Sequence, residues 1–349
     1  MKILLILFAT TFLFAKTQVE LKQEFSARAE KEKWTFTYDE KVLGENPVFN
    51  ATQAGQYRTG FKKIMGKFKK GFTYDSLKDM DVPLPAEWDW RTQATLLPVR
   101  NQGNCGSCWA FSTIAATYDA LAIKGKFPAT GPLSEQYLVD CATDMYGCDG
   151  GMPEAFNWVK APKGAPLNSD YPYTAQDGSC KMAGKVIAGQ IQEWHYIGES
   201  DRLPTIDEMK KAIYTYGPIS VTVCANGPFV SYTSGIYNAC SQCTTNHMTD
   251  LVGWSDAGKY WIMRNSWGSS WGENGYMRIK WTGSNGQLCN RLGEDSVYVK
   301  VDEKIVPPTP KEFEMSVTDV ITIKVKMNVN AKYTIEEAKK ILQPIMDQE

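Results

Sequence analysis

Histidine is scarce in this sequence, because the 349-residue chain contains only His195 and His247. A general base that works near neutral or mildly acidic pH is most often a histidine, so only these two positions supply one of that kind. His195 lies between aromatic residues in the strand-like stretch "EWHYIG", which is typical of a packed structural residue. We therefore expect histidine chemistry to depend on His247, in "TTNHMTDLVGW".

Long apolar segments are also rare. Beyond the N-terminus, no stretch approaches the roughly 18 consecutive apolar residues that a membrane span needs, so no stable membrane insertion is expected. The start, "MKILLILFATTFLFAK", has one basic residue, an apolar run and Ala15 as a cleavage point. This layout indicates a signal peptide over residues 1–15, with a buried N-terminal strand as the alternative. The sequence thus predicts the secretory pathway, leading to a lysosome- or vacuole-like compartment or to the outside of the cell.

Net charge is nearly absent, at −1 for the whole chain, and the sequence has no repeats and no low-complexity tract. The charge is uneven, since residues 16–83 carry +3 and residues 84–300 carry −3. Six basic residues between Arg58 and Lys70 have no acid among them. Such a run is usually a solvated face, and its interleaved phenylalanines would also suit nucleic acid. In an exported protein we favour a third interpretation, in which this segment docks on the acidic body, and we expect no nucleic-acid partner.

Nine cysteines are present. Disulfides persist in an oxidising pathway, and the odd count predicts four bridges and one free thiol. Two of the nine form the C-x-x-C pair of "NQGNCGSCWAFS" at 101–112. This pair has three interpretations: half of a zinc site completed by Cys240 and Cys243, a redox dithiol, or one structural and one reactive cysteine. The separation of the two pairs disfavours zinc, and we expect no metal or other cofactor.

The pattern of residues predicts an α+β fold. Residues 84–190 are mainly helical in pattern, with one helix beginning near Cys108 and another after the N-cap residue Ser134. From about 200 to 300, β-branched and aromatic runs between Gly-rich turns predict strands. A helical half followed by a strand half implies a cleft where the halves meet.

Two further segments flank this body. Residues 16–83 are rich in Lys and Glu, with a helix expected within 18–34, and they end at prolines. Residues 301–349 form a C-terminal extension, in which the stiff linker "VPPTP" is followed by a strand, "ITIKVKMNV", and a capped helix, "TIEEAKKIL".

Cys108 has the surroundings of a nucleophile. It lies where a Gly-rich loop gives way to a helix, and a helix N-terminus favours the thiolate over the thiol. His247 opens a strand of the second half, where it can face Cys108 across the cleft. Downstream, "MRNSWGSSWGENGY" offers Asn265, which can accept a hydrogen bond from the imidazole, and Trp267, which can shield that bond from water. Together these residues suggest a Cys, His, Asn triad.

These motifs resemble the papain family of cysteine proteases. "CGSCW" matches the family signature in full, and His247 and Asn265 follow Cys108 by 139 and 157 residues, against an expected separation of about 130 to 150. "NQG", "GCDGG" and "NSWGSSWGENGY" match as well, so the resemblance covers about 84–300. It implies a papain-like two-domain fold, with a helical left domain, a β-barrel-like right domain and the active-site cleft between them.

The resemblance also implies catalytic roles. Cys108 would be the nucleophile of a cysteine endopeptidase, and His247 the general base and later acid. Asn265 would orient His247. Gln102 would bind the oxyanion together with the backbone N–H of Cys108.

The same resemblance implies how a peptide binds. Gly150 and Gly151 would hydrogen-bond its extended backbone. The pocket for its P2 side chain would be lined by four residues: Met152, Pro153, Thr222 and Met248. Two methionines give an adaptable apolar wall that suits Leu or Phe. Glu294, at the pocket floor, would also accept Arg, unless it points to solvent.

Three disulfides follow from the resemblance: Cys105–Cys148, Cys141–Cys180 and Cys240–Cys289. Counting then pairs Cys224 with Cys243 and leaves Cys108 free.

Residues 16–83 are expected to form an inhibitory propeptide, although they lack the long E, R, F, N, I, N pattern of many family propeptides. Asn50, in the only sequon, is predicted to be glycosylated. No histidines remain for a cathepsin B-type occluding loop, so removal of dipeptides from C-termini is not expected. The expected partners are polypeptide substrates, the chain's own propeptide and cystatin-like inhibitors. Two rival functions stay open: a catalytically silent binding protein and a thiol-disulfide oxidoreductase using "CGSC".

Overall fold

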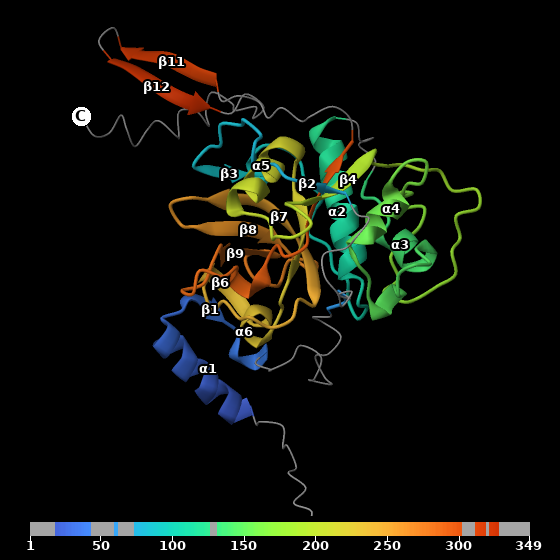
Figure 1. Ribbon diagram of the computed structural model, residues 1–349, viewed down its shortest axis with the longest axis horizontal. Coiled ribbons are helices and arrows are strands. Elements are labelled where there is room, and N and C mark those ends of the chain that lie inside the picture. The colour runs from blue at the N-terminus through green and yellow to red at the C-terminus, as the bar shows by residue number, and fades with distance from the viewer. Residues whose placement is uncertain are drawn as a thin grey trace, which may run out of the picture.

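The computed structural model describes residues 18–42, 59–61, 73–125, 131–301, 311–318 and 321–327. Helices α2, α3 and α4 gather on one side of the body, and the large sheet lies on the other side (Figure 1). The α-helices of the described part are α1 (Gln18–Glu32), α2 (Cys108–Ile123), α3 (Glu135–Cys141), α4 (Phe156–Val159), α5 (Ile206–Tyr216) and α6 (Gly227–Val230). Short 3-10 turns are η1 (Glu40–Val42), η2 (Trp90–Thr92), η3 (Gly147–Asp149), η4 (Pro153–Ala155) and η5 (Cys289–Arg291).

One sheet runs through the whole body. Its strands are β1 (Thr35–Tyr38), β2 (Tyr74–Asp75), β3 (Glu87–Asp89), β4 (Glu193–Ile197), β5 (Ile219–Val223), β6 (Tyr232–Tyr237), β7 (His247–Ser255), β8 (Tyr260–Arg264), β9 (Tyr276–Lys280) and β10 (Ser296–Lys300). They are arranged in the order β1-β6-β9-β8-β7-β5-β10-β4-β2, and β3 pairs with β7 off this path. The predicted α+β fold is confirmed, but the sheet is open and does not close into a barrel.

Helix α2 lies between the two halves. Its sequence, "CWAFSTIAATYDALAI", is apolar on almost every face, and 13 of its 16 residues are buried. A helix that is apolar all round must be covered on all sides, and α2 packs against α3 and α4 as well as against β5, β7 and β10. Its first residue, Cys108, therefore lies at the seam between the helical half and the sheet.

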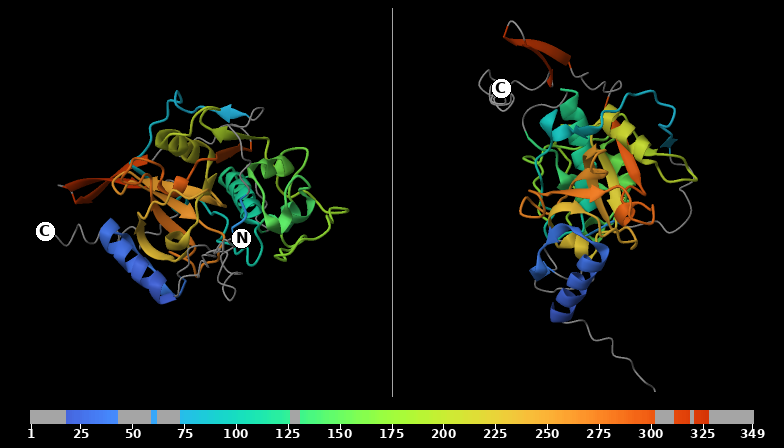
Figure 2. Two further views of the ribbon diagram at one scale, coloured as in Figure 1. Left: turned by 60° about the horizontal axis from the view of Figure 1, so that its bottom comes forward. Right: turned by 90° about the vertical axis from the view of Figure 1, so that its left-hand side faces the viewer.

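The segment before residue 84, which we call the pro-segment after the role that the resemblance implies, adds both edge strands of the sheet, β1 and β2, and the sequence analysis predicted neither. β1 pairs antiparallel with β6, with Phe36 opposite Gly235. Phe36 is buried, and its ring stacks on Trp34 at 4.9 Å and contacts Tyr237 at 4.7 Å between centroids. The preceding helix α1 confirms the helix expected within 18–34. It lies on the outside of the body (Figure 2).

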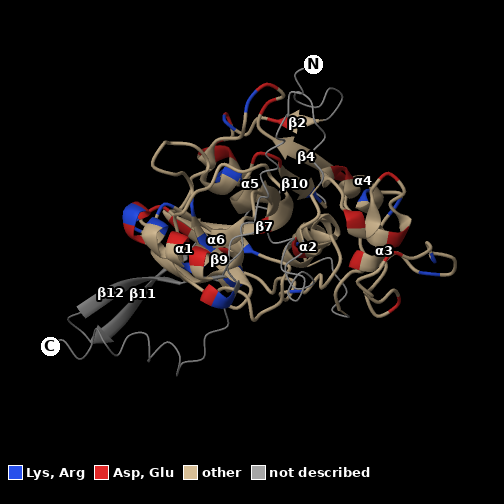
Figure 3. Cartoon of the chain, turned by 90° about the horizontal axis from the view of Figure 1, so that it is seen from below, with Lys and Arg blue, Asp and Glu red and all other residues tan. Residues whose placement is uncertain are grey.

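Docking of this segment combines ionic and non-ionic contacts, since Lys78 Nζ pairs with Glu199 Oε1 of the body at 3.4 Å. Charged side chains of both signs lie along α1 (Figure 3). The ion pairs Arg28–Glu32 and Lys22–Glu40 both join residues of this same segment. The contacts of β1 with β6 are hydrogen bonds and ring packing, as in the 2.6 Å contact between the hydroxyls of Thr37 and Thr233. The six basic residues that were expected to dock by charge lie outside the described residues.

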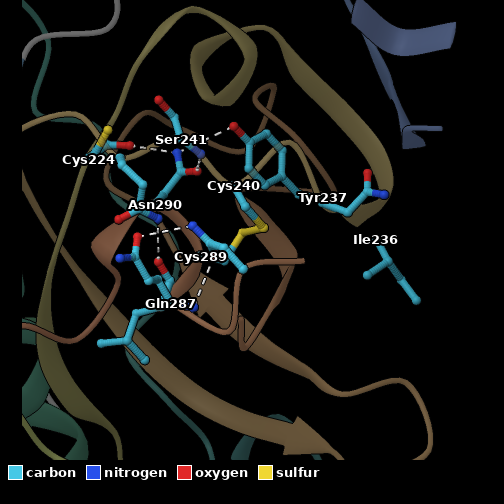
Figure 4. The surroundings of a disulfide bond; sticks show 12 residues. Cys224, Ile236, Tyr237, Cys240, Ser241, Gln287, Cys289 and Asn290 are labelled. Atoms are coloured by element: carbon cyan, nitrogen blue, oxygen red, sulfur yellow. Dashed lines mark hydrogen bonds between the residues drawn. A yellow bond between two sulfur atoms is a disulfide. The ribbon is translucent and has the colours of Figure 1, made fainter. Parts of the chain in front are cut away.

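Four disulfides cross-link the body in the pairs expected: Cys105–Cys148, Cys141–Cys180, Cys224–Cys243 and Cys240–Cys289. Figure 4 shows the last of these beside Asn290. Asn290 is fully buried; its Nδ2 donates to the carbonyl of Cys224 at 2.7 Å, and its Oδ1 accepts from the N–H of Ser241 at 2.7 Å. One side chain thus joins the backbone next to two neighbouring bridges.

Helix α5 interrupts the region in which only strands were predicted. A capping box begins it, because Thr205 accepts from the backbone N–H of Glu208 while Glu208 accepts from that of Thr205. The spacing Thr-x-x-Glu is a helix-start signal, and the strand prediction for 200–300 overlooked it. The predicted strands around "ISVTV", "HMTDLVGW", "YWIMRNSW" and "GYMRIKW" are confirmed as β5, β7, β8 and β9.

The C-terminal extension contains a hairpin of its own. β11 (Lys311–Thr318) pairs with β12 (Ile321–Met327) in a separate two-stranded sheet, so the predicted strand has a partner that was not foreseen. The predicted helix after it, the signal peptide and Asn50 lie outside the described residues. None of the helices in the described ranges has both the length and the apolar content of a membrane span.

Candidate active site

Cys108 is a buried free thiol at the first residue of α2. Burial raises its pKa to about 12, and the backbone N–H groups of Met248, Gly60 and Trp109 oppose that rise only in part. The backbone N–H groups at the start of α2 act in the expected direction, because those of Trp109 and Cys108 lower the thiol pKa, but burial outweighs them in this form of the protein. Gly60, a residue of the pro-segment, lies among the groups at the sulfur.

His247 is held by Asn265 across the β7–β8 pair. The His247 Nε2 lies 2.8 Å from Asn265 Oδ1, and that oxygen also accepts from the backbone N–H of Ser266 at 2.8 Å. Because an atom that accepts from a backbone N–H must be the amide oxygen, Nε2 of the imidazole is the protonated nitrogen. The Nδ1 atom has no hydrogen-bond partner within the described ranges, which leaves it available as a base.

Burial also controls the protonation of His247. It lowers the pKa of the imidazole to about 4, although the hydrogen bond to Asn265 acts in the opposite direction. Trp267 stacks on the imidazole at 4.6 Å between centroids, and the indole is itself held edge-on by Phe229 and Trp271. The His247–Asn265 bond is therefore shielded from water, as the sequence suggested.

Gln102 lies buried beside the same strand end. Its Oε1 accepts from the hydroxyl of Ser266 at 2.6 Å, and its Nε2 donates to the carbonyl of Cys105 at 2.9 Å. An amide nitrogen has two N–H groups, so one remains for an oxyanion. Sequence reasoning missed Ser266, although its place directly after Asn265 was a signal.

The pro-segment enters the site at Gly60 and Phe61. The carbonyl of Asn246 accepts from both backbone N–H groups, at 3.2 and 2.9 Å, and Gly151 N–H donates to the carbonyl of Gly60 at 2.8 Å. A Cβ on Gly60 would lie 1.8 Å from the carbonyl oxygen of Gly106, so only glycine fits here. The pro-segment thus occupies the same Gly151 edge that the sequence assigned to substrate.

The two glycines of that edge differ in their contacts. The carbonyl of Gly150 accepts from the N–H of Tyr146 within its own loop, at 2.9 Å, whereas Gly151 contacts the pro-segment. A Cβ on Gly151 would lie 2.4 Å from the Trp109 ring. Close packing of backbone on indole therefore requires glycine at 151.

Phe61 pairs with Gly151 in an isolated β-bridge, directly before Met152, the first of the residues predicted for the P2 pocket. Phe61, Met152 and Met248 belong to one buried cluster with Cys108. Thr222 is paired with Met248 in the β5–β7 register, and Pro153 begins η4 directly after Met152.

Glu294 does not point to solvent. Its side chain is 10% exposed and pairs with Arg291, whose Nε donates to Oε1 at 2.7 Å. The sequence analysis did not foresee this partner, although the i, i+3 spacing of opposite charges allows it.

The rival cysteine and histidine assignments are not supported. Cys105, Cys240 and Cys243 form disulfides, so a zinc site or a redox dithiol built with them is unavailable in this form. His195 lies on β4, where its ring stacks on Tyr298 and its Nε2 lies 3.1 Å from a Glu193 carboxylate oxygen.

Similarity to known proteins agrees with this geometry. The family model described as "Papain family cysteine protease" matches residues 84–299. Digestive cysteine proteinase 3 of Homarus americanus is 35% identical over 274 residues, which cover 74% of this chain and 79% of that protein. Procathepsin L of Mus musculus is 38% identical over 226 residues, which cover 61% of this chain and 65% of that protein.

Two solved structures share the fold. Digestive procathepsin L2 proteinase from Tenebrio molitor larval midgut has a TM-score of 0.67 at 28% identity, covering 81% of this chain and 90% of that chain. The bromelain protease from Ananas comosus, in complex with the E64 inhibitor, has a TM-score of 0.57 at 35% identity, covering 63% of this chain and 100% of that chain. Because the family model matches more than half of the 349 residues of this chain, the chain belongs to the papain family of cysteine proteases.

Proposed function

We propose that this chain is the precursor of a cysteine endopeptidase whose nucleophile is Cys108. The observation that supports it most directly is the buried His247–Asn265 hydrogen bond of 2.8 Å. This bond keeps the imidazole proton on Nε2 and leaves Nδ1 available as the base. This base lies on a strand packed against α2, the helix that begins with Cys108.

The reaction proceeds in two steps. Cys108 gives its proton to His247 Nδ1, and the sulfur attacks the scissile carbonyl to form a tetrahedral oxyanion. Gln102 Nε2 and the Cys108 backbone N–H donate to that oxyanion. The two donors stabilise the transition state by about 3 kcal/mol. The C–N bond breaks as His247 protonates the leaving amine, which leaves a thioester. Water, deprotonated by His247, then hydrolyses the thioester and regenerates the thiol.

The pro-segment keeps this machinery inactive. With Gly60 over the sulfur, the thiol has a raised pKa and the imidazole a lowered one, so both groups are neutral. We assign residues 16–83 to the propeptide, 84–300 to the peptidase and 301–349 to an extension. Release of Gly60 and Phe61 would admit water and stabilise the thiolate–imidazolium pair.

Phe61 supports an apolar P2 preference. It lies beside Gly151 and shares a buried cluster with Met152 and Met248, which supports the proposal that a substrate Phe or Leu fills this space once the pro-segment leaves. An Arg at P2 would have to exchange with Arg291 for the Glu294 carboxylate. Leu and Phe should therefore be preferred to Arg, with some tolerance of Arg through Glu294.

The proposal extends to partners and location. Polypeptides are the substrates, and cystatin-like inhibitors would bind the same cleft. The signal peptide and Asn50 glycosylation predict transit through the secretory pathway to a vacuole-like compartment or to the exterior.

The test is hydrolysis of fluorogenic dipeptides with Phe, Leu or Arg at P2 by the processed protein, at about pH 5.5, below the reference histidine pKa. Cys108→Ala is the control, and a thiol-directed epoxide counts the active sites. We expect hydrolysis by wild type, none by the variant, and rates in the order Phe or Leu above Arg. Wild type that binds the epoxide at Cys108 without hydrolysing any dipeptide would favour the silent binding protein.

A further inference from the structure

A buried polar cluster lies behind the proposed triad. It consists of Asp119 on α2, Asp250 on β7 and Arg264 on β8, all nearly inaccessible to solvent. Arg264 Nη2 donates to Asp119 Oδ2 at 2.7 Å and lies 3.5 Å from Asp250 Oδ2, while Nη1 donates to the carbonyl of Leu97 at 2.9 Å. One guanidinium therefore serves two carboxylates, and with both ionised the cluster would hold an uncompensated buried negative charge.

The hydrogen bonds of Ser112 indicate which carboxylate holds a proton. Its hydroxyl lies 3.0 Å from the carbonyl of Thr249, 3.0 Å from Asp250 Oδ1 and 2.6 Å from the hydroxyl of Ser220. A hydroxyl has a single proton to donate. All these contacts are satisfied together when Ser220 donates to Ser112, Ser112 donates to Thr249, and a protonated Asp250 donates to Ser112.

Of the two carboxyl groups, that of Asp119 is the better placed to be ionised. It accepts the 2.7 Å bond from Arg264 and a second one, also 2.7 Å, from the backbone N–H of Leu97. Asp250 is farther from the guanidinium. The charged groups that face Asp250 are Arg264 from β8 and Asp119 from α2, and Arg100, which is paired with Glu135, lines the same cavity. The polar ones are Ser112 and, through it, Ser220 on β5.

The cluster is placed to align the catalytic residues. Ser112 is one helical turn from Cys108 on α2, and Arg264 immediately precedes Asn265. Asp250 lies directly opposite Arg264 in the β7–β8 register, on the strand that begins with His247. The contacts of Asp250 and Arg264 thus join the nucleophile's helix to both strands that carry the base and its orienting amide.

A small cavity extends this link to Asn265. Its lining includes Thr249, Asp250, Arg264 and Asn265, and the space open to the centre of a water molecule is ≈ 20 Å³. Thr249 Oγ1 and Asn265 Nδ2 are buried and have no hydrogen-bond partner within the described ranges. The rest of the wall includes apolar residues such as Phe111 and Met248. A cavity of this size into which several polar groups point suits one ordered water, which would accept from Asn265 Nδ2 and connect it to the cluster.

We propose that Asp250 is a positioning residue for the Cys108, His247, Asn265 triad. In its protonated form it donates to Ser112 and, with Arg264, holds α2 against β7 and β8. The roles given to the triad rest on the proposed function.

Titration of Asp250 supplies a readout specific to this role. Burial raises the pKa of its carboxyl from 3.8 to about 7. An acid whose pKa is higher in the folded protein than in the unfolded chain is stabilising when protonated, and that stabilisation is lost as pH rises between the two values. Alignment and stability should therefore weaken from about pH 4 to about pH 7.

The experiment compares Asp250→Asn, Asp250→Ala and the matched control Asp256→Asn, a half-exposed acid just beyond the same strand. The processed enzymes are titrated with the epoxide, and kcat, KM and thermal inactivation are measured across about pH 4 to 8. An asparagine amide donates to Ser112 at every pH. We therefore expect Asp250→Asn to keep kcat within about two-fold at low pH and to lose the fall in thermal stability between about pH 4 and 7. Asp250→Ala should lower kcat per titrated site about ten-fold, with KM little changed. Asp256→Asn, which loses only the ion pair with Lys210, should match wild type in kcat and KM and keep the fall in stability between about pH 4 and 7.

Two results would overturn the proposal. One is an unchanged pH dependence in Asp250→Asn; the other is a normal kcat per titrated site in Asp250→Ala, which would make the cluster merely structural. Should Asp250→Ala fail to fold, Arg264→Lys takes its place, since lysine keeps the charge but cannot reach both Asp119 and Leu97. The stability arm needs no turnover, so a failure of the proposed protease function would be seen separately, as wild type that does not hydrolyse peptides.

Discussion

The pro-segment meets the body at β1, at Gly60 and Phe61, and at β2, which pairs with β4; the first two contacts are built differently. At the sheet edge, β1 joins β6 through a ladder of hydrogen bonds and buries Phe36 among aromatic rings. At the candidate site, Gly60 and Phe61 bind through backbone groups of Asn246 and Gly151, and the Phe61 side chain belongs to the buried cluster that holds Cys108. The first contact supplies binding energy away from the chemistry, and the second covers the nucleophile. Docking and inhibition should therefore be separable by mutation.

The largest effect is expected from Gly60→Val. The new Cβ would overlap the carbonyl of Gly106, at 1.8 Å, so Gly60 has to leave the sulfur. The unprocessed precursor should then react with the epoxide at least about 100-fold faster than wild type, a loss of roughly 3 kcal/mol of inhibitory binding. Docking through β1 should persist, as judged by thermal unfolding of the precursor.

Processing provides the control for this substitution. Once the propeptide has been removed, Gly60→Val protein should have the kcat/KM of wild type, because the altered residue is gone. A precursor that stays as unreactive as wild type would mean that the Gly60 contact does not block the thiol.

The converse substitution is Phe36→Ala, at the docking contact. Loss of a buried phenylalanine usually costs about 3 to 5 kcal/mol, and we expect the lower part of this range because Phe36 lies at a sheet edge. Thermal unfolding of a Cys108→Ala precursor, which cannot process itself, should show the loss. Epoxide reactivity of the Cys108-containing precursor should rise far less than in Gly60→Val, since cleft contacts remain. Equal rises in the two variants would contradict separable contacts.

Acid should release the cleft contact through His247. Its pKa is lowered to about 4 in the closed precursor, from 6.5. Because an open cleft readmits water, the open form binds a proton more readily, and opening becomes favoured as pH falls from about 6.5 towards 4. We expect cleavage of Cys108→Ala precursor by added processed enzyme to accelerate about ten-fold or more over this range, relative to a denatured substrate.

A second precursor isolates the histidine. In the Cys108→Ala, His247→Asn double variant, the acceleration should be largely lost. If both precursors show the same acceleration, the carboxylates of the body, residues 84–300 with a net charge of −3, must supply the pH dependence.

The sequence predicted which residues lie together at the candidate site better than it predicted how the pro-segment packs on the body. Local motifs in the sequence contain Cys108, His247 and Asn265 and suggested their roles. The side chain of Ser134 was enough to predict the start of a helix. β1 was missed because its four residues have little pattern of their own, and its partner lies 201 residues away at the Thr35–Ile236 contact. The burial that outweighs the helix N-terminus at Cys108 was not foreseen for the same reason, since Gly60, which lies at the sulfur, comes from a distant segment.

Arg291 shows the same limit on a smaller scale. Glu294 was expected either to bind Arg at P2 or to face solvent, and its ion pair with Arg291 depends on the turn formed by η5. Arg291 is about one-third exposed, at 35%, so its pair with Glu294 contributes little to stability.

The smallest effect is therefore expected from Arg291→Ala. Removing the guanidinium leaves the Glu294 carboxylate available to a P2 arginine, while the apolar wall of Met152 and Met248 is unchanged. Hydrolysis of the P2-Arg dipeptide should rise about three-fold relative to P2-Leu, in keeping with an exposed ion pair of under about 1 kcal/mol. Glu294→Gln should lower the same ratio. If neither substitution moves it, Glu294 does not contact the P2 side chain, and P2 selection depends on the pocket that Phe61 fills in the precursor.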